Sequence, residues 1–197
     1  MSARKPKPQI ATSIATRVKN PESKILSSRT VFRGRVFNVR RDRVIEPNGV
    51  TAIREVIQHS GSVVILAIDD SQSEVRILLE RQYRYSAHDY LLELPAGRID
   101  PGENALAAGK RELLEETGYT ARKWRQVLHF YPSPGFLNET MTVLLAQTLR
   151  PGLANPEADE FIEYELIPLG QALKLIRTGR IRDGKTIAGT LWLAHFG

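Results

Sequence analysis

Three glutamates lie close together in the middle of the chain and could do chemistry. Glu112, Glu115 and Glu116 are related as i, i+3 and i+4, so in an α-helix their carboxylates share one face. Like charges at this spacing destabilise a helix unless a positive charge lies among them. Carboxylate oxygens are ligands that suit Mg²⁺ or Mn²⁺. The spacing therefore indicates either a divalent-cation site or a solvated acidic face with ordinary ion pairs.

The loop before these glutamates contains residues that let it fold back over the start of the helix. Gly97 and Pro101-Gly102 permit tight turns, which would bring backbone carbonyl groups toward the glutamates. Glu103 and Arg111 are eight residues apart, which is about two helical turns. We expect them to form an ion pair that fixes the loop to the helix.

Strands must supply most of the framework around this segment. Alternating apolar residues predict a hairpin over residues 30–58, with its turn at Pro47-Asn48-Gly49. Further strands are expected at residues 62–68, 74–82, 91–94, 123–130, 140–147 and 161–166. Helices are expected at residues 104–117, 169–178 and 185–194, and Gly118 is suited to cap the first of them. This order is neither strict βαβ alternation nor all-β, so we predict an α+β fold with a mixed sheet between helices.

Composition excludes several classes of protein. The chain has 197 residues, of which 42% are hydrophobic and 25% charged, as in ordinary globular proteins. The absence of cysteine excludes disulfides and thiolate metal ligands, and the four histidines show no zinc-ligand spacing. The longest apolar run, residues 63–68, is far shorter than the roughly 20 residues of a membrane-spanning helix. No apolar signal core follows the basic N-terminus. We therefore expect a cytoplasmic protein with no membrane partner.

The positive charge is concentrated at the N-terminus. Residues 1–43 contain 12 Lys and Arg against two acidic residues, so the rest of the chain is net negative although the total is +6. A nucleic-acid-binding protein would spread positive charge over its folded body, so no specific nucleic-acid partner is expected. Residues 1–28 are predicted to form a basic flexible tail, with a transit peptide or a weak polyanion contact as alternatives.

The segment around the three glutamates resembles the signature of the Nudix hydrolases. That signature is G-x5-E-x7-R-E-U-x-E-E-x-G-U, where U is a large apolar or aromatic residue. Every position is matched, by Gly97, Glu103, Arg111, Glu112, Leu113, Glu115, Glu116, Gly118 and Tyr119. Seven fixed identities at fixed spacing arise by chance with odds below about one in a hundred thousand. This match favours the cation site over the solvated acidic face.

Residues outside the signature narrow the resemblance. Pro134 lies 16 positions after Gly118, within Tyr-Pro-Ser-Pro-Gly-Phe (131–136), and this arrangement resembles the ADP-ribose pyrophosphatase branch. The resemblance runs from about residue 31 to residue 196. It implies a Nudix fold, an α/β/α sandwich around a mixed β-sheet, over residues 59–197. It also implies an N-terminal antiparallel sheet at residues 29–58 that is exchanged between the subunits of a homodimer.

The resemblance implies hydrolysis of the diphosphate bond of a nucleoside diphosphate sugar. The expected reaction splits ADP-ribose into AMP and ribose 5-phosphate, with two or more Mg²⁺ or Mn²⁺ ions. One alternative is another nucleotide-linked substrate, such as a GDP-sugar. A second is a Nudix-fold sensor that binds ADP-ribose without turnover, against which the complete set of signature carboxylates argues.

The resemblance also assigns the metal ligands. It implies that Glu112, Glu116 and the backbone carbonyl of Ala96 bind metal. Glu115 would be a further ligand or a catalytic partner that acts through water.

The resemblance assigns substrate-binding residues outside the signature. Arg84 corresponds to a phosphate-binding arginine. Arg54 and Phe37 correspond to residues that reach the adenine, across the dimer, although Phe37 could equally be a core aromatic. Glu139 would lie near the ribose or a metal.

The resemblance to the ADP-ribose pyrophosphatase branch implies that the general base lies outside the signature, on a late loop, and the matching loop here is residues 152–160. Glu160 and Glu157 are the candidates. Glu160 is preferred because it precedes the strand that begins at Phe161, which would anchor it.

Overall fold

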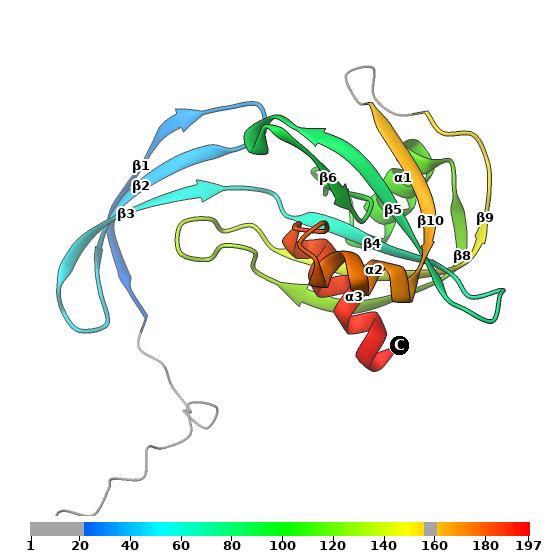
Figure 1. The fold of residues 1–197 in the computed structure, drawn as a ribbon. Helices are drawn as coiled ribbons and strands as arrows, with labels where there is room; N and C mark the ends of the chain where they lie inside the picture. The colour runs from blue at the N-terminus through cyan, green and yellow to red at the C-terminus, as the bar shows by residue number, and fades with distance from the viewer. Residues whose placement is uncertain (1–21, 156–160) are drawn as a thin grey trace, which may run out of the picture.

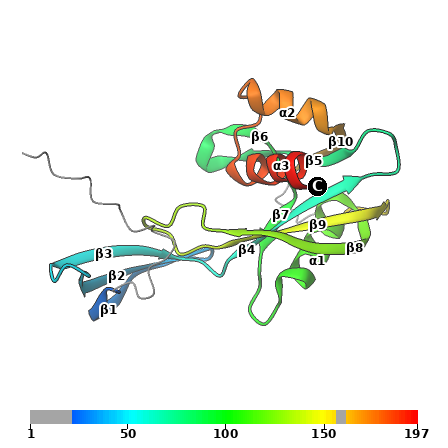
Figure 2. The same cartoon turned by 90° about the horizontal axis from the view of Figure 1, so that it is seen from below.

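The structure, a computed structural model, describes residues 22–155 and 161–197. It contains two sheets and three α-helices within these residues. In Figures 1 and 2 the N-terminal sheet projects from one end of a body that holds the larger sheet and all three α-helices.

The N-terminal sheet has three antiparallel strands. They are β1 (Lys24–Arg33), β2 (Asn38–Ile45) and β3 (Thr51–Gln58), in that spatial order. The turn between β2 and β3 contains Asn48, whose Oδ1 accepts a hydrogen bond from the Val50 N–H at 3.1 Å. The predicted hairpin is therefore present, but as part of a larger sheet.

The extra strand arises because a turn divides the run from residue 30 to residue 45. The Gly34 N–H donates to the Phe37 carbonyl at 3.0 Å, so the chain reverses direction at this point. Strand β1 also begins at Lys24, inside the segment expected to be tail, and its first residue pairs with Ile45 of β2. Cross-strand pairing, which local pattern does not reveal, orders these residues.

The larger sheet is mixed. Its spatial order is β10-β5-β4-β9-β8, with β6 paired to β5 and β7 paired to β4. The strands are β4 (Ser62–Asp69), β5 (Arg76–Arg84), β6 (Asp89–Glu93), β7 (Ala96–Arg98), β8 (Thr120–Phe130), β9 (Met141–Arg150) and β10 (Ile162–Pro168). Strands β4 and β9 are parallel, and the other pairs are antiparallel. The predicted α+β fold with a mixed sheet is confirmed.

Helices cover both faces of this sheet. Helix α1 (Ala105–Thr117) packs on one face, and α2 (Leu169–Arg177) and α3 (Gly184–Phe196) pack on the other. Figure 2 shows the two sides. The apolar run at residues 63–68 forms β4, in which residues 63–67 have no exposed surface. A strand covered on both faces needs apolar side chains at successive positions. None of the helices in the described ranges is long and apolar enough to span a bilayer.

Both ends of α1 are capped. Asn104 Oδ1 accepts a hydrogen bond from the Ala107 N–H at 2.9 Å, as an N-cap residue does. Gly118 has φ +72° at the C-cap, and its N–H donates to the Leu114 carbonyl at 2.9 Å. Positive φ favours glycine, so Gly118 fixes where the helix ends.

We expect Gly118→Ala to destabilise the fold. A Cβ on Gly118 would lie 2.6 Å from the Ala154 nitrogen and 2.8 Å from the Leu153 carbonyl carbon. Because these are backbone atoms, the strain cannot be relieved by rotating a side chain, and we expect a loss of about 2–3 kcal/mol. Gly49→Ala is the matched control, since Gly49 also has positive φ but a Cβ added there would meet nothing within 4 Å. Equal losses of unfolding free energy in urea for the two variants would contradict this explanation.

Candidate active site

Arg111 organises the loop that precedes α1. Its Nη2 donates to Glu103 Oε2 at 3.0 Å and to the Arg98 carbonyl at 3.2 Å. The predicted ion pair between Glu103 and Arg111 is therefore present. The hydrogen bond from Arg111 holds the pKa of Glu103 below its ordinary value, and Glu103 in turn raises the pKa of Arg111. The loop is fixed to the helix by a charge pair that persists across the neutral pH range.

Arg111 also contacts two of the three glutamates. Its Nη1 donates to Glu112 Oε1 at 2.8 Å and to Glu115 Oε2 at 3.1 Å. The Glu115 side chain is 44% exposed, and that of Glu112 is 13% exposed. As the side chains lie, residues 22–155 and 161–197 contain no group of three acidic or imidazole side chains gathered as a metal site. A cation at this place would have to compete with Arg111 for Glu112 and Glu115.

Glu112 lies against the backbone of the loop. A Cβ on Gly97 would be only 1.8 Å from Glu112 Oε1, so the carboxylate fills the space that a side chain at residue 97 would need. Gly97 directly follows Ala96 in strand β7, which pairs with β4. The glycine therefore allows the Glu112 carboxylate to approach the loop segment that contains the Ala96 carbonyl.

We expect Gly97→Ala to impair the site without unfolding the protein. The atoms in conflict belong to the end of a flexible glutamate side chain, which can rotate away at small cost. The displaced carboxylate should weaken Mn²⁺ binding, measured by calorimetry, by at least about tenfold. The melting temperature should fall by no more than about 2 °C. Gly184→Ala is the control, because a Cβ at Gly184 meets nothing within 4 Å; similar Mn²⁺ affinities in the two variants would contradict the prediction.

Glu116 belongs to a buried group of charged residues below α1. Glu80 and Glu93 are each 1% exposed, and Glu116 is 5% exposed. Glu80 on β5 and Glu93 on β6 are directly paired across the sheet, and Glu80 hydrogen-bonds with Glu116. Burial raises the pKa of Glu80 to about 7, although Glu116 and Arg84 lower it in part. Buried carboxylates this close require either a proton or a cation.

Arg84 lies beside the same group. Its Nε and Nη2 each donate to Glu93 at 2.9 Å, forming a two-bond fork. Lys185 from α3 also pairs with Glu93. Burial by itself would raise the pKa of Glu93, but the hydrogen bonds and charges of Arg84 and Lys185 outweigh burial and hold this pKa below its ordinary value. The structure thus places the predicted phosphate-binding arginine next to Glu116.

These residues fit a divalent cation. Glu112 lies in the space beside Gly97, and Glu116 lies one helical turn further along the same face of α1. The donors are carboxylate oxygens together with the nearby carbonyl of Ala96, which suit Mg²⁺ or Mn²⁺. Burial is the main cause of the raised pKa of Glu80, which lies against Glu116, and a cation bound beside these carboxylates would favour their charged forms. Ala96, Glu112 and Glu116, with Glu115 at the edge, could hold such an ion.

Glu139 is brought close to the loop that precedes α1. Its Oε1 accepts a hydrogen bond from Ser62 Oγ at 2.5 Å and lies 3.5 Å from His59 Nδ1. Ser62 pairs with Arg98 at the end of β7. Glu139 therefore lies at the rim of the same region.

Phe37 lines a pocket of about 500 Å³ between the N-terminal sheet and the body. Arg98 and Pro101 from the loop before α1 line the same pocket, as does Asn138. Phe37 is 38% exposed, so it is not a buried core aromatic. In a single chain it thus faces a pocket that is partly lined by the loop before α1.

Arg54 is not brought to the glutamates in a single chain. It lies on β3, where its Nη2 pairs with Glu46 Oε1 at 2.5 Å, and its side chain is 55% exposed. In both views the N-terminal sheet extends away from α1 (Figures 1 and 2). Any contact of Arg54 with this site would have to be made in a second subunit.

Both candidate bases, Glu157 and Glu160, lie outside the described residues. The flanks of their loop are described. The Asn155 N–H donates to the Glu115 carbonyl at 2.9 Å, and Ile162 pairs with Gln82 on β5. The described residues on either side of this loop therefore lie against α1 and beside β5.

Sequence reasoning did not single out Glu80, Glu93 or Lys185. Glu80 follows Ile77, Leu78 and Leu79, and Glu93 lies between leucines. A carboxylate inside a short apolar strand is a signal of a buried charge with a specific partner. The residues next to Lys185 in the sequence gave no sign that it would pair with Glu93.

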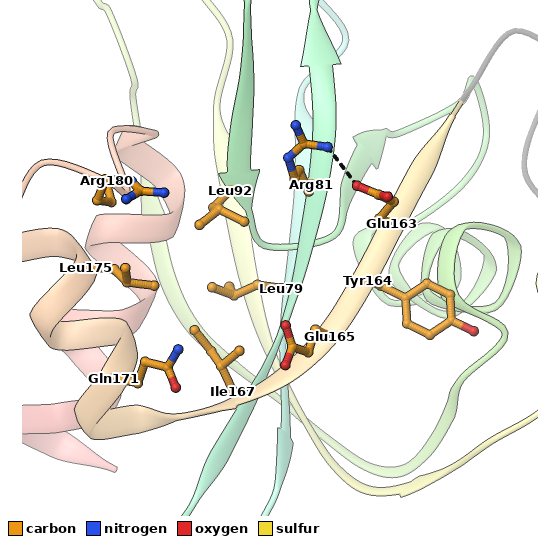
Figure 3. A pocket seen from close by; sticks show the side chains of 10 residues that line it. All are labelled: Leu79, Arg81, Leu92, Glu163, Tyr164, Glu165, Ile167, Gln171, Leu175 and Arg180. Carbon is orange, nitrogen blue, oxygen red and sulfur yellow. Dashed lines mark hydrogen bonds and ion pairs between the residues drawn. The ribbon is translucent and has the colours of Figure 1, made fainter.

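A second pocket, of about 420 Å³, lies on the other face of the sheet (Figure 3). Its walls come from β5, β6, β10 and α2, and the ion pair between Arg81 and Glu163 at 2.7 Å crosses its edge. Because side chains alternate along β5, Leu79 and Arg81 face away from Glu80. This pocket is separate from the glutamate site.

Comparison with known proteins covers nearly all of the described chain. The family model of the NUDIX domain matches residues 58–189, and that of the nucleoside diphosphate sugar hydrolase N-terminal domain matches residues 24–57. The chain is 37% identical over 171 residues to an ADP-ribose pyrophosphatase of Bacillus subtilis (strain 168), covering 86% of this chain and 91% of the relative. It is 32% identical over 143 residues to a GDP-mannose pyrophosphatase of Salmonella choleraesuis (strain SC-B67), covering 68% and 73%.

A solved structure supports the fold independently. The crystal structure of an ADP compounds hydrolase superposes with a TM-score of 0.77 at 23% identity, covering 89% of this chain and 94% of that one. At this identity the likeness concerns the fold alone.

Proposed function

The chain belongs to the Nudix hydrolase family, and we propose that it hydrolyses ADP-ribose to AMP and ribose 5-phosphate with Mg²⁺ or Mn²⁺. One observation carries this proposal more than any other. The carboxylate of Glu112 lies in the space beside Gly97, the residue that follows Ala96 in β7, on the same face of α1 as Glu116. This is an arrangement of oxygen donors that a binding module without turnover would not need.

The metal would be held by Glu112, Glu116 and the Ala96 carbonyl, with Glu115 as a further contact. The chemistry that a divalent cation held by these residues would supply is neutralisation of the diphosphate charge and a lower pKa of the attacking water. We infer that two or more ions act together, because the diphosphate carries charge on both phosphoryl groups.

The chain's own residues would bind and orient the substrate. Arg84 binds a phosphate oxygen, since its guanidinium lies beside Glu116 and is fixed by Glu93. Glu139 accepts a hydrogen bond from a hydroxyl of the terminal ribose. Phe37 and Arg54 offer an aromatic and a guanidinium face for adenine.

A loop carboxylate would remove the proton from the attacking water. We assign this role to Glu160, with Glu157 as the alternative. Water then attacks one phosphorus, the bridging P–O bond breaks, and each product keeps one phosphate.

We propose a homodimer, and the exposed surface of the N-terminal sheet supports it. The large apolar residues of its strands and their connections that are at least 46% exposed are Ile25, Leu26, Val31, Phe32, Val36, Val50 and Ile53. A small sheet with this much exposed apolar surface needs a partner. A second copy is the commonest partner in soluble assemblies, and it would bring Arg54 toward the site of the other subunit.

Substrate choice is tested by comparing ADP-ribose with GDP-mannose, because relatives of both kinds match the chain. Guanine recognition usually adds an acidic or amide group at the base edge, and the sequence identifies none. We expect kcat/KM for ADP-ribose to exceed that for GDP-mannose by at least about tenfold, which corresponds to about 1.4 kcal/mol. Equal or reversed values would overturn the choice of ADP-ribose as substrate and leave the Nudix assignment untouched, and reversed values would favour a GDP-sugar. The absence of turnover with either, together with tight ADP-ribose binding, would indicate a sensor.

A further inference from the structure

The first turn of α3 holds the strand that leads into the loop before α1. Asp183, the N-cap of α3, accepts hydrogen bonds from the Thr186 N–H at 2.9 Å and from the Thr186 hydroxyl at 2.6 Å. The Thr186 hydroxyl in turn accepts from the Leu94 N–H at 2.7 Å. Thr186 and Leu94 have no exposed surface. Because Leu94 comes two residues before Ala96, α3 fixes the backbone at the entrance to the glutamate site.

Lys185 lies in the same turn of α3. Its side chain is 9% exposed, and its Nζ pairs with Glu93 Oε2 and, at 3.1 Å, with Asp183 Oδ2. The first turn of a helix is the end at which the helix dipole disfavours a cation. The two carboxylates, rather than the helix, therefore account for this lysine.

The carboxylate of Glu93 pairs with two cations, Arg84 and Lys185. The fork to Arg84 uses Nε and Nη2 of the guanidinium, so Nη1 is not part of it. Lys185, which lies on α3 whereas Arg84 lies on β5, contacts the same carboxylate. Lys185 also pairs with Asp183, so Arg84 and Lys185 together balance the charges of Glu93 and Asp183. The group lies beside Glu80 and Glu116.

We propose that Lys185 is a positioning residue for the substrate diphosphate and acts through Glu93 on Arg84. With Lys185 present, a second cation shares the Glu93 carboxylate, so Glu93 orients the guanidinium of Arg84 while offsetting less of its positive charge. Without Lys185, Arg84 alone would compensate a buried carboxylate, and less of its charge would act on an anion. The inference rests on the proposed function, since it concerns the diphosphate that Arg84 binds. It gives the C-terminal helix a part in substrate binding that the Nudix signature does not include.

The test compares Lys185→Met and Lys185→Arg with Lys174→Met, which changes an exposed lysine on α2. Two measurements are made on the full chain: KM and kcat for ADP-ribose, and the affinity for ADP by calorimetry in EDTA. Lys185→Met should raise KM and weaken ADP binding by about tenfold each, with kcat within about threefold of wild type. Lys185→Arg should restore both to within about threefold. Lys174→Met should behave as wild type.

Three results would overturn the inference. The first is wild-type KM and ADP affinity in Lys185→Met. The second is a fall in kcat with KM unchanged, and the third is a defect in Lys185→Arg as large as that in Lys185→Met. If Lys185→Met does not fold, Lys185→Gln replaces it, since glutamine keeps a donor for Glu93 without the charge. Unfolding of both, with Lys185→Arg folded, would assign Lys185 to stability instead and would also overturn the inference.

The ADP measurement separates this inference from the proposed function. It needs neither a metal nor turnover. A wild-type chain that binds ADP through Lys185 but hydrolyses no nucleoside diphosphate sugar would remove the proposed function and leave this inference standing.

Discussion

Glu116→Gln should lower kcat for ADP-ribose by about three orders of magnitude while the fold is retained. Glu116 is 5% exposed and hydrogen-bonds with Glu80. Another side chain therefore has little room to move in and replace its carboxylate as a metal ligand. An amide of the same shape keeps the packing but loses the charge that holds a cation. It also removes one of two buried carboxylates in contact, so we expect a melting temperature no lower than that of wild type.

The control for this variant is Glu74→Gln, which changes an exposed glutamate between β4 and β5. Calorimetry with Mn²⁺ gives a measurement that does not depend on turnover. Near-native kcat in Glu116→Gln at saturating Mg²⁺ would contradict the metal-site assignment. Unchanged Mn²⁺ binding would contradict it equally.

Mixing two impaired variants should restore activity if the N-terminal sheet serves the partner's site. In the proposed dimer each site takes Glu116 from one subunit and Arg54 from the other. Arg54→Ala and Glu116→Gln therefore remove residues that different subunits supply to one site. In a mixed dimer one site then keeps both residues and the other loses both. Random pairing of equal amounts leaves about a quarter of all sites intact. We expect the mixture to reach about a quarter of wild-type activity, against roughly a few per cent or less for either variant alone.

This experiment depends on the assembly, which light scattering checks. The proposed homodimer should have twice the 22.2 kDa mass of the chain at micromolar concentration. A mixture no more active than the average of its two components would show that no site takes Arg54 from a partner. Full activity in a 22.2 kDa monomer would contradict the homodimer itself.

The parts of the site that the sequence predicted are local in the chain. Glu103 and Arg111 pair as expected, and helix α1 begins and ends within a residue of its predicted bounds. Spacing within one helix and its preceding loop determines which side chains share a face. A pattern of this kind can therefore be read without knowledge of the rest of the fold.

The parts that were missed depend on pairing between distant segments. Glu80 meets Glu93 only through the register of β5 and β6, and Lys185 is 92 residues from Glu93. Apolar pattern predicts that a strand exists but does not say which strand lies beside it. Likewise, the division of residues 30–45 into two strands follows from the turn at Gly34 and the pairing of β1 with β2.

The most direct test of the account is the release of phosphate monoesters from ADP-ribose, measured with Mg²⁺ and with excess EDTA. We predict AMP and ribose 5-phosphate in equal amounts with Mg²⁺, and a rate lower by at least about three orders of magnitude in EDTA. Equal rates in Mg²⁺ and EDTA, or no phosphate monoester in either, would contradict a metal-dependent diphosphate hydrolase built on Glu112 and Glu116.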